Sequence, residues 1–461
     1  MLCLLPSRLG GKLNILKPPK ETKMKRKIKF IHTADLHLGS ILHVKNRVPN
    51  NLENIFDNSV YEAFKNICDE AILNKVDFVL ISGDIYDKEA RSVKGNSYFV
   101  EQCRRLEKEN IKVYAIAGNH DPIGKQSELF TLPSNVHIFG TDAAETKEFV
   151  DGEGNLVCRI LGQSYRESSE SRKMHKSYNA PKDDILNIAL LHTQLDNSKD
   201  YVPALPSELK EKESIHYWAL GHVHKAQTIS HREPSIVFPG IPQGRDFGEE
   251  GVNGAVIVEA EGSEILSIKP LPAALIVYKK LELNLNDYSH KVMDTLSDLE
   301  SLMSEKYEAM LSEKEETSYV PKGYIIRWTI TGRSKIYSLV EDKDEDASEY
   351  LVEGLNNSFL SQSPFIYTDS VSLNIGKPIE NLKEIIEGNA TFKEIDKVAK
   401  ELYEVTTQKE ELLKGLGNLW ELPNNPEDYN LKKLQLDNKL YEEILEKAQQ
   451  LIMDHLLEDG E

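Results

Sequence analysis

The stretch that decides the fold is Val79–Asp87, with the sequence VLISGDIYD. An apolar run over residues 78–81 ends abruptly in Ser-Gly and then Asp84. Such a run is typical of a buried strand of a parallel sheet, which is apolar on both faces because helices cover both. Asp84 then lies at the carboxyl end of the strand, where open α/β sheets bind ligands. One Asp in this place is a weak signal, because Asp also caps helices and turns.

Four further predicted strands are each followed by residues that can bind a metal ion. Residues 28–32 lead to Asp35 and His37, 113–117 lead to Asn119, His120 and Asp121, 186–191 lead to His192, and 217–220 lead to His222 and His224. A single histidine at a strand end is more often structural than a ligand. We call the residues that directly follow a strand its exit. Five exits with ligand-type residues are hard to explain by structural roles alone, and we expect them all at one edge of one sheet.

The ligand types indicate which metals would fit. Two carboxylates, an amide oxygen and four imidazoles suit a pair of divalent ions such as Mn²⁺, Fe or Zn²⁺. The imidazoles argue against Mg²⁺ or Ca²⁺, and the lack of thiolates argues against a structural zinc site. Two such cations would outweigh the two carboxylates, so the predicted pocket is positive and attracts phosphate oxygens.

The remaining pattern predicts an α/β protein with further parts. The chain has 461 residues, too many for one hydrophobic core. Residues 1–23 lack periodicity and read as a disordered or non-native extension before Met24, and residues 24–272 form the main domain, with helices over 54–73 and 96–109. Strands over 236–238, 255–259 and 265–268 follow without helices between them, which predicts a second, antiparallel sheet. Residues 273–376 read as a smaller α+β domain.

The tail, residues 377–461, is predicted to be helical and strongly charged. The sequence Thr391-Phe392-Lys393-Glu394 is a capping box, and apolar residues recur at helical spacing after it and again over 431–457. These stripes either pack on the body of the protein or dock a partner helix or coiled coil, and the sequence favours neither.

Charge and composition limit the function. The net charge of −19 argues against a protein that holds nucleic acid by overall attraction, so such a role needs a local basic surface, a metal site or a partner. No stretch approaches the roughly 20 apolar residues of a membrane span, and the N-terminus does not resemble a secretory signal. The four cysteines are scattered without a CxxC pair, which favours a reducing, cytoplasmic location.

Several motifs resemble the calcineurin-like metallophosphoesterase superfamily. They are DLH at 35–37, GDIYD at 83–87, GNHD at 118–121, the strand-end His192, and GHVH at 221–224. The longer stretches HTADLHLG, AIAGNHDP and PGIPQGRDFGEEGVNGAVIVE resemble the DNA-repair exonuclease branch, with its SbcD-like and YhaO-like members. The resemblance covers roughly residues 28–275. It implies a four-layer β-sandwich flanked by helices, with a capping domain and C-terminal helices.

The resemblance also implies roles for individual residues. It assigns Asp35, His37, Asp84 and His224 to one metal ion, and Asp84, Asn119, His192 and His222 to the other. His120 would stabilise the transition state and protonate the leaving oxygen. Asp121 would orient its neighbours or simply shape the turn before Pro122. Some nucleases of this group carry a second catalytic histidine where this chain has Asp87, which we expect to support the fold or the ligands instead.

The leading hypothesis is a Mn²⁺-dependent DNA phosphodiesterase, an exonuclease or endonuclease of DNA repair in which a metal-bound hydroxide attacks phosphorus. One alternative is the same centre acting on a small phosphodiester, a phosphomonoester or a phosphoprotein. Another is a scaffold for an SMC-like coiled-coil ATPase bound through the C-terminal helices. The resemblance further implies a homodimer. Candidate contacts to the DNA backbone are Arg91, Lys94, Arg166, Arg172, Lys173, Lys176 and Arg245.

Overall fold

The computed structural model describes residues 26–87, 93–125, 130–231, 234–312, 319–341, 343–378 and 390–404, and isolated positions between 444 and 455. The chain divides into two compact units. The first contains the chain up to Ser40, then Val60–Gln243 and Asn253–Ala274. The second contains Ile41–Ser59, Gly244–Val252 and the chain from Leu275. The sequence reading treats 24–272 as one continuous domain, whereas here two of its segments group with the second unit. The expected extension 1–23 and most of the C-terminal helical tail lie outside the described residues.

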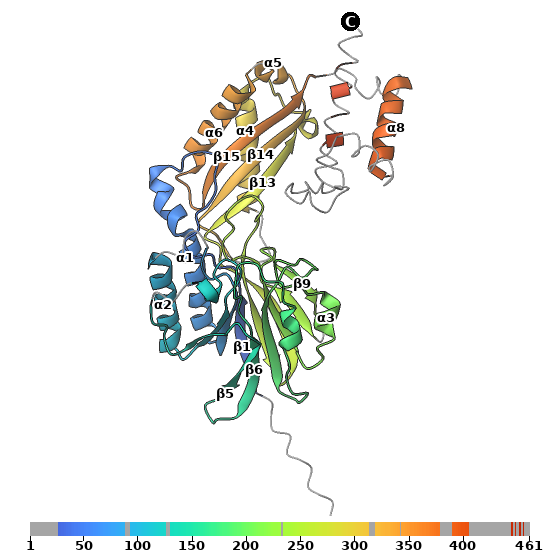
Figure 1. Ribbon diagram of the computed structural model, residues 1–461. Coiled ribbons are helices and arrows are strands. Elements are labelled where there is room, and N and C mark those ends of the chain that lie inside the picture. The colour runs from blue at the N-terminus through green and yellow to red at the C-terminus, as the bar shows by residue number, and fades with distance from the viewer. Residues whose placement is uncertain are drawn as a thin grey trace, which may run out of the picture. The chain divides into compact units, whose positions relative to one another are not determined.

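The first unit is built on two six-stranded sheets (Figure 1). One sheet has the order β12-β11-β1-β2-β3-β4, with strands Glu264–Pro272, Gly254–Glu261, Lys27–Thr33, Phe78–Ser82, Lys112–Ile116 and Val136–Ile138. The other has the order β5-β6-β7-β8-β10-β9, with strands Glu145–Val150, Leu156–Gly162, Leu186–His192, Tyr217–Gly221, Ser235–Phe238 and Gln227–Ser230. Strands β1 to β4 are parallel, as are β6, β7, β8 and β10.

Apolar side chains fill three layers of this unit. The inner faces of the two sheets share one core, which includes Phe30, Phe78 and Tyr217. The outer face of the first sheet is covered by α1 (Asn50–Leu73) and α2 (Val93–Lys108) (Figure 1). The outer face of the second sheet packs against α3 (Pro206–Lys210), the 3₁₀ turn Met174–Ser177 and the loops around them. The result is a β-sandwich flanked by helices, which confirms the fold class expected from sequence. Each central strand is covered on both sides, which explains why β2 is buried along its whole length.

Two details of the expected topology are wrong. The five strand exits do not share one sheet, because β1, β2 and β3 belong to one sheet and β7 and β8 to the other. Strands β11 and β12 are antiparallel as expected, but they extend the first sheet beside β1, whereas β10 lies parallel to β8 in the second. The order of strands in a sheet depends on long-range pairing, which local sequence patterns do not report.

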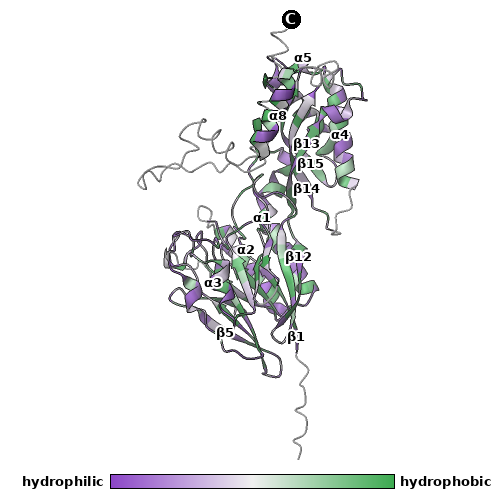
Figure 2. Ribbon diagram, turned by 90° about the vertical axis from the view of Figure 1, so that its right-hand side faces the viewer, coloured by the Kyte–Doolittle hydropathy of each residue, from purple (hydrophilic) through white to green (hydrophobic). Residues whose placement is uncertain are grey.

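The second unit contains a three-stranded parallel sheet, β13-β14-β15, with strands Ile276–Asn284, Gly323–Arg333 and Phe365–Gly376. One face packs against α4 (Leu296–Ser312), α5 (Tyr337–Val340) and α6 (Asp344–Phe359). Helix α4 carries both hydrophilic and hydrophobic residues, as Figure 2 shows, and it buries Leu299, Leu302, Met303 and Tyr307. The other face packs on apolar residues of the two inserted segments, among them Leu52, Phe56 and Phe247. Helix α8 spans Ala390–Glu404.

The three described cysteines all lie in the first unit: Cys68 in α1, Cys103 in α2 and Cys158 in β6. Each is buried with a free thiol, and burial raises the pKa of each thiol. Among the described residues, no helix is long and apolar enough to cross a bilayer.

Candidate metal centre

The loops after β1, β2, β3, β7 and β8 bring the predicted ligand side chains together at one end of the sandwich. The DLH loop is held against the GDIYD loop by backbone hydrogen bonds: the amides of Asp35 and His37 donate to the carbonyls of Gly83 and Asp84, both at 3.0 Å. The amide of His222 donates to both carboxylate oxygens of Asp35 at 3.1 Å, which ties the second sheet to the first. Two sheets therefore build one site.

The backbone at this site is strained. Asp35, His37, Asp84 and His222 all have positive φ angles, of 54°, 45°, 52° and 98°. Non-glycine residues rarely adopt this conformation, and clusters of it mark functional sites. Two glycines permit the close packing: a Cβ at Gly83 would overlap the His192 ring, and one at Gly118 would overlap the Asp84 carboxylate. Gly83 and Gly118 are thus needed because a larger residue at either position would collide with His192 or Asp84.

In the part of the chain that the structure describes, three groups of side chains could hold a metal ion, with the potential ligand atoms of each group within 4.8 Å of one another. They are Asp35-His37-His224, Asp84-His192-His222 and His37-Asp84-His120. The Asn119 Oδ1 atom joins the second group, at 2.9 Å from His192 Nε2 and 3.1 Å from His222 Nδ1. Carboxylate, amide and imidazole donors of this kind suit divalent transition ions. The residues present therefore fit two neighbouring cations that share Asp84.

Electrostatics favour a cation at the same place. Asp35 and Asp84 are both at most 1% exposed, and their charges act on the imidazoles around them. Burial opposes protonation of His192, but the carboxylates of Asp84 and Asp35 and the Ser82 carbonyl raise its pKa to about 9. Burial opposes ionisation of Asp84, but the His192 and His37 imidazoles hold the pKa of that carboxyl well below its usual range. A pocket that attracts a proton so strongly attracts a metal cation for the same reason.

The orientation of His192 leaves one nitrogen for a metal. Its Nδ1 lies 2.8 Å from the Ser82 carbonyl, so Nδ1 carries the proton in the neutral ring and Nε2 carries the lone pair. Nε2 lies 3.4 Å from Asp84 Oδ2. Outer hydrogen bonds of this kind fix the tautomer of metal-binding histidines in general.

His120 is placed differently from the deeply buried side chains. Its backbone amide donates to Asp84 Oδ1 at 2.9 Å, while its imidazole remains 35% exposed. Its Nδ1 lies 3.3 Å from Asp87 Oδ1, and its ring meets the His37 ring edge-on at 4.7 Å. Asp87 therefore contacts an imidazole that is partly exposed.

Asp121 braces the loops. Its Oδ1 accepts from the Gly118 amide at 2.7 Å, and its Oδ2 accepts from the amides of Ile85 at 2.8 Å and Tyr86 at 3.3 Å. Burial, followed by the nearby charge of Asp84, raises its pKa to about 6. Asp121 thus bonds to its own turn and links that turn to the GDIYD loop, while its role toward the ligands stays a prediction.

Sequence reasoning missed two residues beside the site. His32 is fully buried, with Nδ1 3.0 Å from the Tyr217 hydroxyl and Nε2 3.1 Å from the Leu220 carbonyl, so it joins the two sheets beneath the ligands. Burial lowers its pKa to about 3, which keeps it neutral. The Tyr201 ring lies on His222 at 4.5 Å. His32 stands in the HTADLHLG motif, but no local signal marks Tyr201.

Several of the basic residues proposed as DNA contacts are engaged within the protein. Arg166, Arg172 and Arg245 pair with Asp142, Glu170 and Glu249, at 2.5, 2.5 and 2.9 Å. Lys173 pairs with Glu208 at 2.7 Å, and the Lys94 ammonium lies over the Tyr61 ring. Arg245 belongs to the second unit, Lys176 lies in the 3₁₀ turn 174–177, and Arg91 lies outside the described residues.

Comparison with known proteins agrees with this geometry. Residues 28–226 match the calcineurin-like phosphoesterase family. The chain is 34% identical over 238 residues to the uncharacterised metallophosphoesterase YhaO of Bacillus subtilis, covering 51% of this chain and 58% of that protein. It is 29% identical over 253 residues to the DNA double-strand break repair protein Mre11 of Methanocaldococcus jannaschii, covering 51% and 63%. The match thus spans less than two thirds of either relative. A dimetal phosphatase from Danio rerio is similar at a TM-score of 0.31 and 11% identity, over 53% of this chain and 99% of that one.

Proposed function

We propose, from the match of residues 28–226 to the calcineurin-like phosphoesterase family, that the chain is a di-metal-dependent phosphodiesterase that cleaves DNA. The observation that carries the proposal is the convergence on one partly buried site of Asp35, His37, Asp84, Asn119, His192, His222 and His224. The named function of the Mre11 relatives supports DNA as the substrate. Mn²⁺ is the metal we expect, and Fe or Zn²⁺ would fit the same donors.

The cations would be held by two sets of residues that share Asp84. We assign Asp35, His37 and His224 to one, and Asn119, His192 and His222 to the other. When bound, two such ions supply an activated water and positive charge beside the phosphoryl oxygens. The protein's own contribution is to keep the ligands fixed, through the backbone bonds of the DLH and GDIYD loops and the Ser82 carbonyl behind His192.

His120 would act on the substrate as a proton donor. Asp87 lies beside Nδ1, and in this proposal Nε2 gives its proton to the leaving sugar oxygen. Asp87 carries a negative charge that would favour the protonated imidazole and hold it in one orientation. His120 also lies close enough to His37 and Asp84 to bind a metal ion, so its role needs a direct test.

The test is cleavage of end-labelled duplex DNA in Mn²⁺ by the purified chain, with metal content measured in parallel. We expect His120→Asn to keep two ions per chain and to lose on the order of 10²-fold or more in rate, the usual contribution of a general acid. His231→Ala, at an exposed histidine outside the site, is the matched control and should behave as wild type. Loss of a metal ion in His120→Asn would make His120 a ligand and refute its role as the acid.

The same assay separates the substrate classes. Cleavage of bis-p-nitrophenyl phosphate without cleavage of single-stranded, hairpin or duplex DNA would refute the nuclease and leave a phosphodiesterase of small substrates.

The SMC-like ATPase partner and the homodimer are part of the same proposal. Helix α8 supports the partner, because it exposes Val398 on a helix that buries Phe392. Deleting residues 377–461 should abolish binding of the ATPase but not hydrolysis of the small diester.

A further inference from the structure

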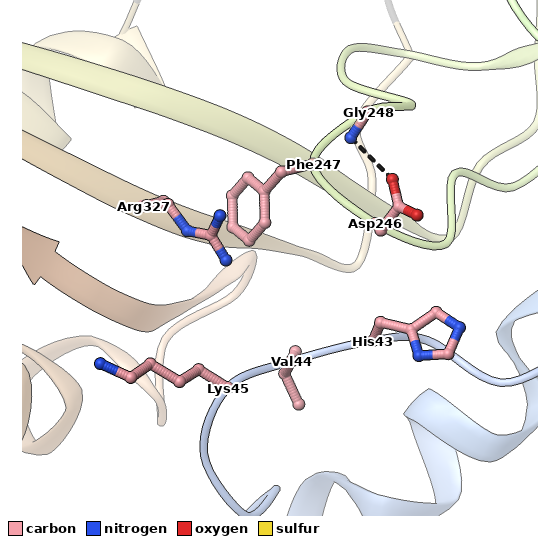
Figure 3. Close-up of a pocket in the computed structure, with 7 residues that line it drawn as sticks. All are labelled: His43, Val44, Lys45, Asp246, Phe247, Gly248 and Arg327. Atoms are coloured by element: carbon pink, nitrogen blue, oxygen red, sulfur yellow. Dashed lines mark hydrogen bonds between the residues drawn. The ribbon is translucent and has the colours of Figure 1, made fainter. Parts of the chain in front are cut away.

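The second unit contains a pocket of about 430 Å³, lined by residues 43–45 and 246–248 and by Arg327 (Figure 3). All of these residues belong to the second unit. In Figure 3, Arg327 and Phe247 lie on one side of the pocket, and Val44 and Lys45 lie on the other. A volume of this size suits a small organic ligand and exceeds what a simple ion needs.

A β-bulge places a buried acid behind the pocket. The pairing of β14 with β15 slips by one residue, so that Ile326 lies opposite Thr368 while Arg327 lies opposite Ser370. The extra residue is Asp369, whose side chain is fully buried. Bulges occur next to binding sites, where they redirect a side chain. Burying a carboxylate in the middle of a strand costs free energy unless the charge is paired. The partners of Asp369 therefore indicate its structural role.

The partners of Asp369 are two residues that line the pocket, Arg327 and Lys45. Its Oδ2 accepts from the Arg327 guanidinium at 2.9 Å, and its Oδ1 accepts from the Lys45 amide at 2.5 Å. The Arg327 guanidinium also lies on the Phe247 ring at 4.0 Å. It is held from two sides in this way, yet its side chain remains 43% exposed. Asp369 and Phe247 therefore present a fixed guanidinium to the pocket.

The other lining groups complement this guanidinium. Among the described residues, the Lys45 ammonium has no carboxylate partner, so a second cation is available beside Arg327. The Asp246 carboxylate accepts from the Gly248 amide at 2.6 Å, and Val44 adds an apolar wall. A phosphate matches Arg327 and Lys45, while a flat base matches the exposed face of a guanidinium, on which nucleobases stack.

We propose that this pocket binds a 5′-phosphorylated nucleotide, with the phosphate on Arg327 and Lys45 and the base between Arg327 and Val44. The nucleotide is either free in solution or the end of a DNA strand, because both present the same group. None of the residues that line this pocket is a proposed metal ligand, and the site does not depend on hydrolysis. The pocket residue His43 follows the proposed metal ligand His37 by six residues in the sequence. A bound nucleotide would therefore contact the chain segment that follows this ligand.

The test is titration calorimetry of the full-length, metal-loaded chain with dAMP, with inorganic phosphate, and with a ten-nucleotide oligothymidylate carrying a 5′-phosphate. We expect Lys45→Ala and Arg327→Gln each to weaken dAMP binding about tenfold, as loss of one phosphate contact does. Lys322→Ala removes an exposed lysine of the same unit outside the pocket and should leave the affinity unchanged. Asp84→Ala should keep the pocket intact, which separates this site from nucleotide binding at the metal centre.

The outcomes distinguish the possible ligands. Tighter binding of the oligonucleotide than of dAMP, lost in Lys45→Ala, identifies a strand end, whereas tighter binding of dAMP identifies a free nucleotide. Equal affinity for phosphate and dAMP overturns the nucleotide assignment. Equal affinity of Lys45→Ala and Lys322→Ala for dAMP overturns the site itself. Lys45 makes this decisive, because its exposed side chain takes no part in the contacts to Asp369 and its removal leaves them in place.

Discussion

The two units of the chain both bury carboxylates, but they compensate for them differently. In the first unit, Asp35 and Asp84 lie in loops at strand ends and are surrounded by imidazoles. Among the described residues, neither carboxylate pairs with a lysine or arginine. In the second unit, Asp369 lies within a strand and pairs with the Arg327 guanidinium and a backbone amide. A guanidinium is always charged, so the Asp369 pair is complete without a ligand.

This difference separates a site that needs a cation from one that does not. Neutral imidazoles stabilise a carboxylate poorly, so Asp35 and Asp84 gain most of their compensation from metal ions or protons. The arginine of the second unit balances the charge of Asp369 without a ligand, and its guanidinium remains partly exposed. The identity of the partner, rather than burial alone, therefore predicts whether a buried acid belongs to a metal site.

The largest effect should come from Asp84→Asn, which removes the charge shared by both proposed cations. We expect hydrolysis of bis-p-nitrophenyl phosphate to fall on the order of 10³-fold, the scale seen when a preorganised charge is lost. Mass spectrometry of the metals should show fewer than two ions per chain. Asp142→Asn, at an exposed acid of the same unit, is the control. Full activity with both ions retained in Asp84→Asn would show that the Asp84 charge is not needed for metal binding. The contrast between Asp84 and Asp369 would then be wrong.

Asp369→Ala should destabilise the second unit by about 3 kcal/mol, because it removes a hydrogen bond to a charged guanidinium and another to the Lys45 amide. Denaturant unfolding measures this change, with Asp287→Ala at an exposed position as the reference, expected within about 0.5 kcal/mol of wild type. The metal content of Asp369→Ala should stay at the wild-type value. A loss of metal ions would show that the two buried-acid sites are not independent.

Chelation of the metals should loosen the first unit alone. A ligand at about 100 times its Kd stabilises the folded state by roughly 2.7 kcal/mol, and EDTA removes this contribution. Hydrogen exchange should then rise in the loops after β1, β2, β7 and β8, while β13 to β15 keep their protection. Equal loss of protection in β14 would contradict the proposed difference between Asp84, which needs a cation, and Asp369, which is paired with Arg327.

Gly118→Ala should lower the rate of hydrolysis by about 10- to 100-fold without changing the ligands themselves, the usual cost of disturbing a group that orients them. The added methyl group would push on the Asp84 carboxylate. Gly152→Ala, where a Cβ meets open space, is the matched control. Kinetics at saturating metal give the answer, and an unchanged rate in Gly118→Ala would mean that the Asp84 position is not critical.

The smallest effect should be that of Asp87→Asn, about tenfold in kcat, because it alters the orientation and charge of the His120 environment and removes no proposed ligand. A pH–rate profile distinguishes this from a structural effect, since loss of the carboxylate should move the limb due to His120 to lower pH. A profile that keeps its shape would assign Asp87 a purely structural role.

The strands and their exits were predictable from sequence because local patterns determine them. The apolar run before Asp84 and the Gly-Asp and Gly-Asn-His exits mark β2 and β3 to within a residue or two. The distribution of the exits over two sheets was not predictable, since it depends on which distant strands pair. The ion pair between Arg245 and Glu249 was not predictable from the motif either, and the DNA contact expected of Arg245 stays a prediction. The bulge at Asp369 left no signal, because an acid in a strand reads as an exposed residue.

The placement of the cysteines gives the first unit a built-in reporter. The second unit has none, because the sequence holds only Cys3, Cys68, Cys103 and Cys158. In a Cys3→Ser variant, a thiol-reactive reagent would modify the protein only when α1, α2 or β6 opens. The labelling rate followed by mass spectrometry would thus give the opening kinetics of the first unit directly, however the second unit behaves.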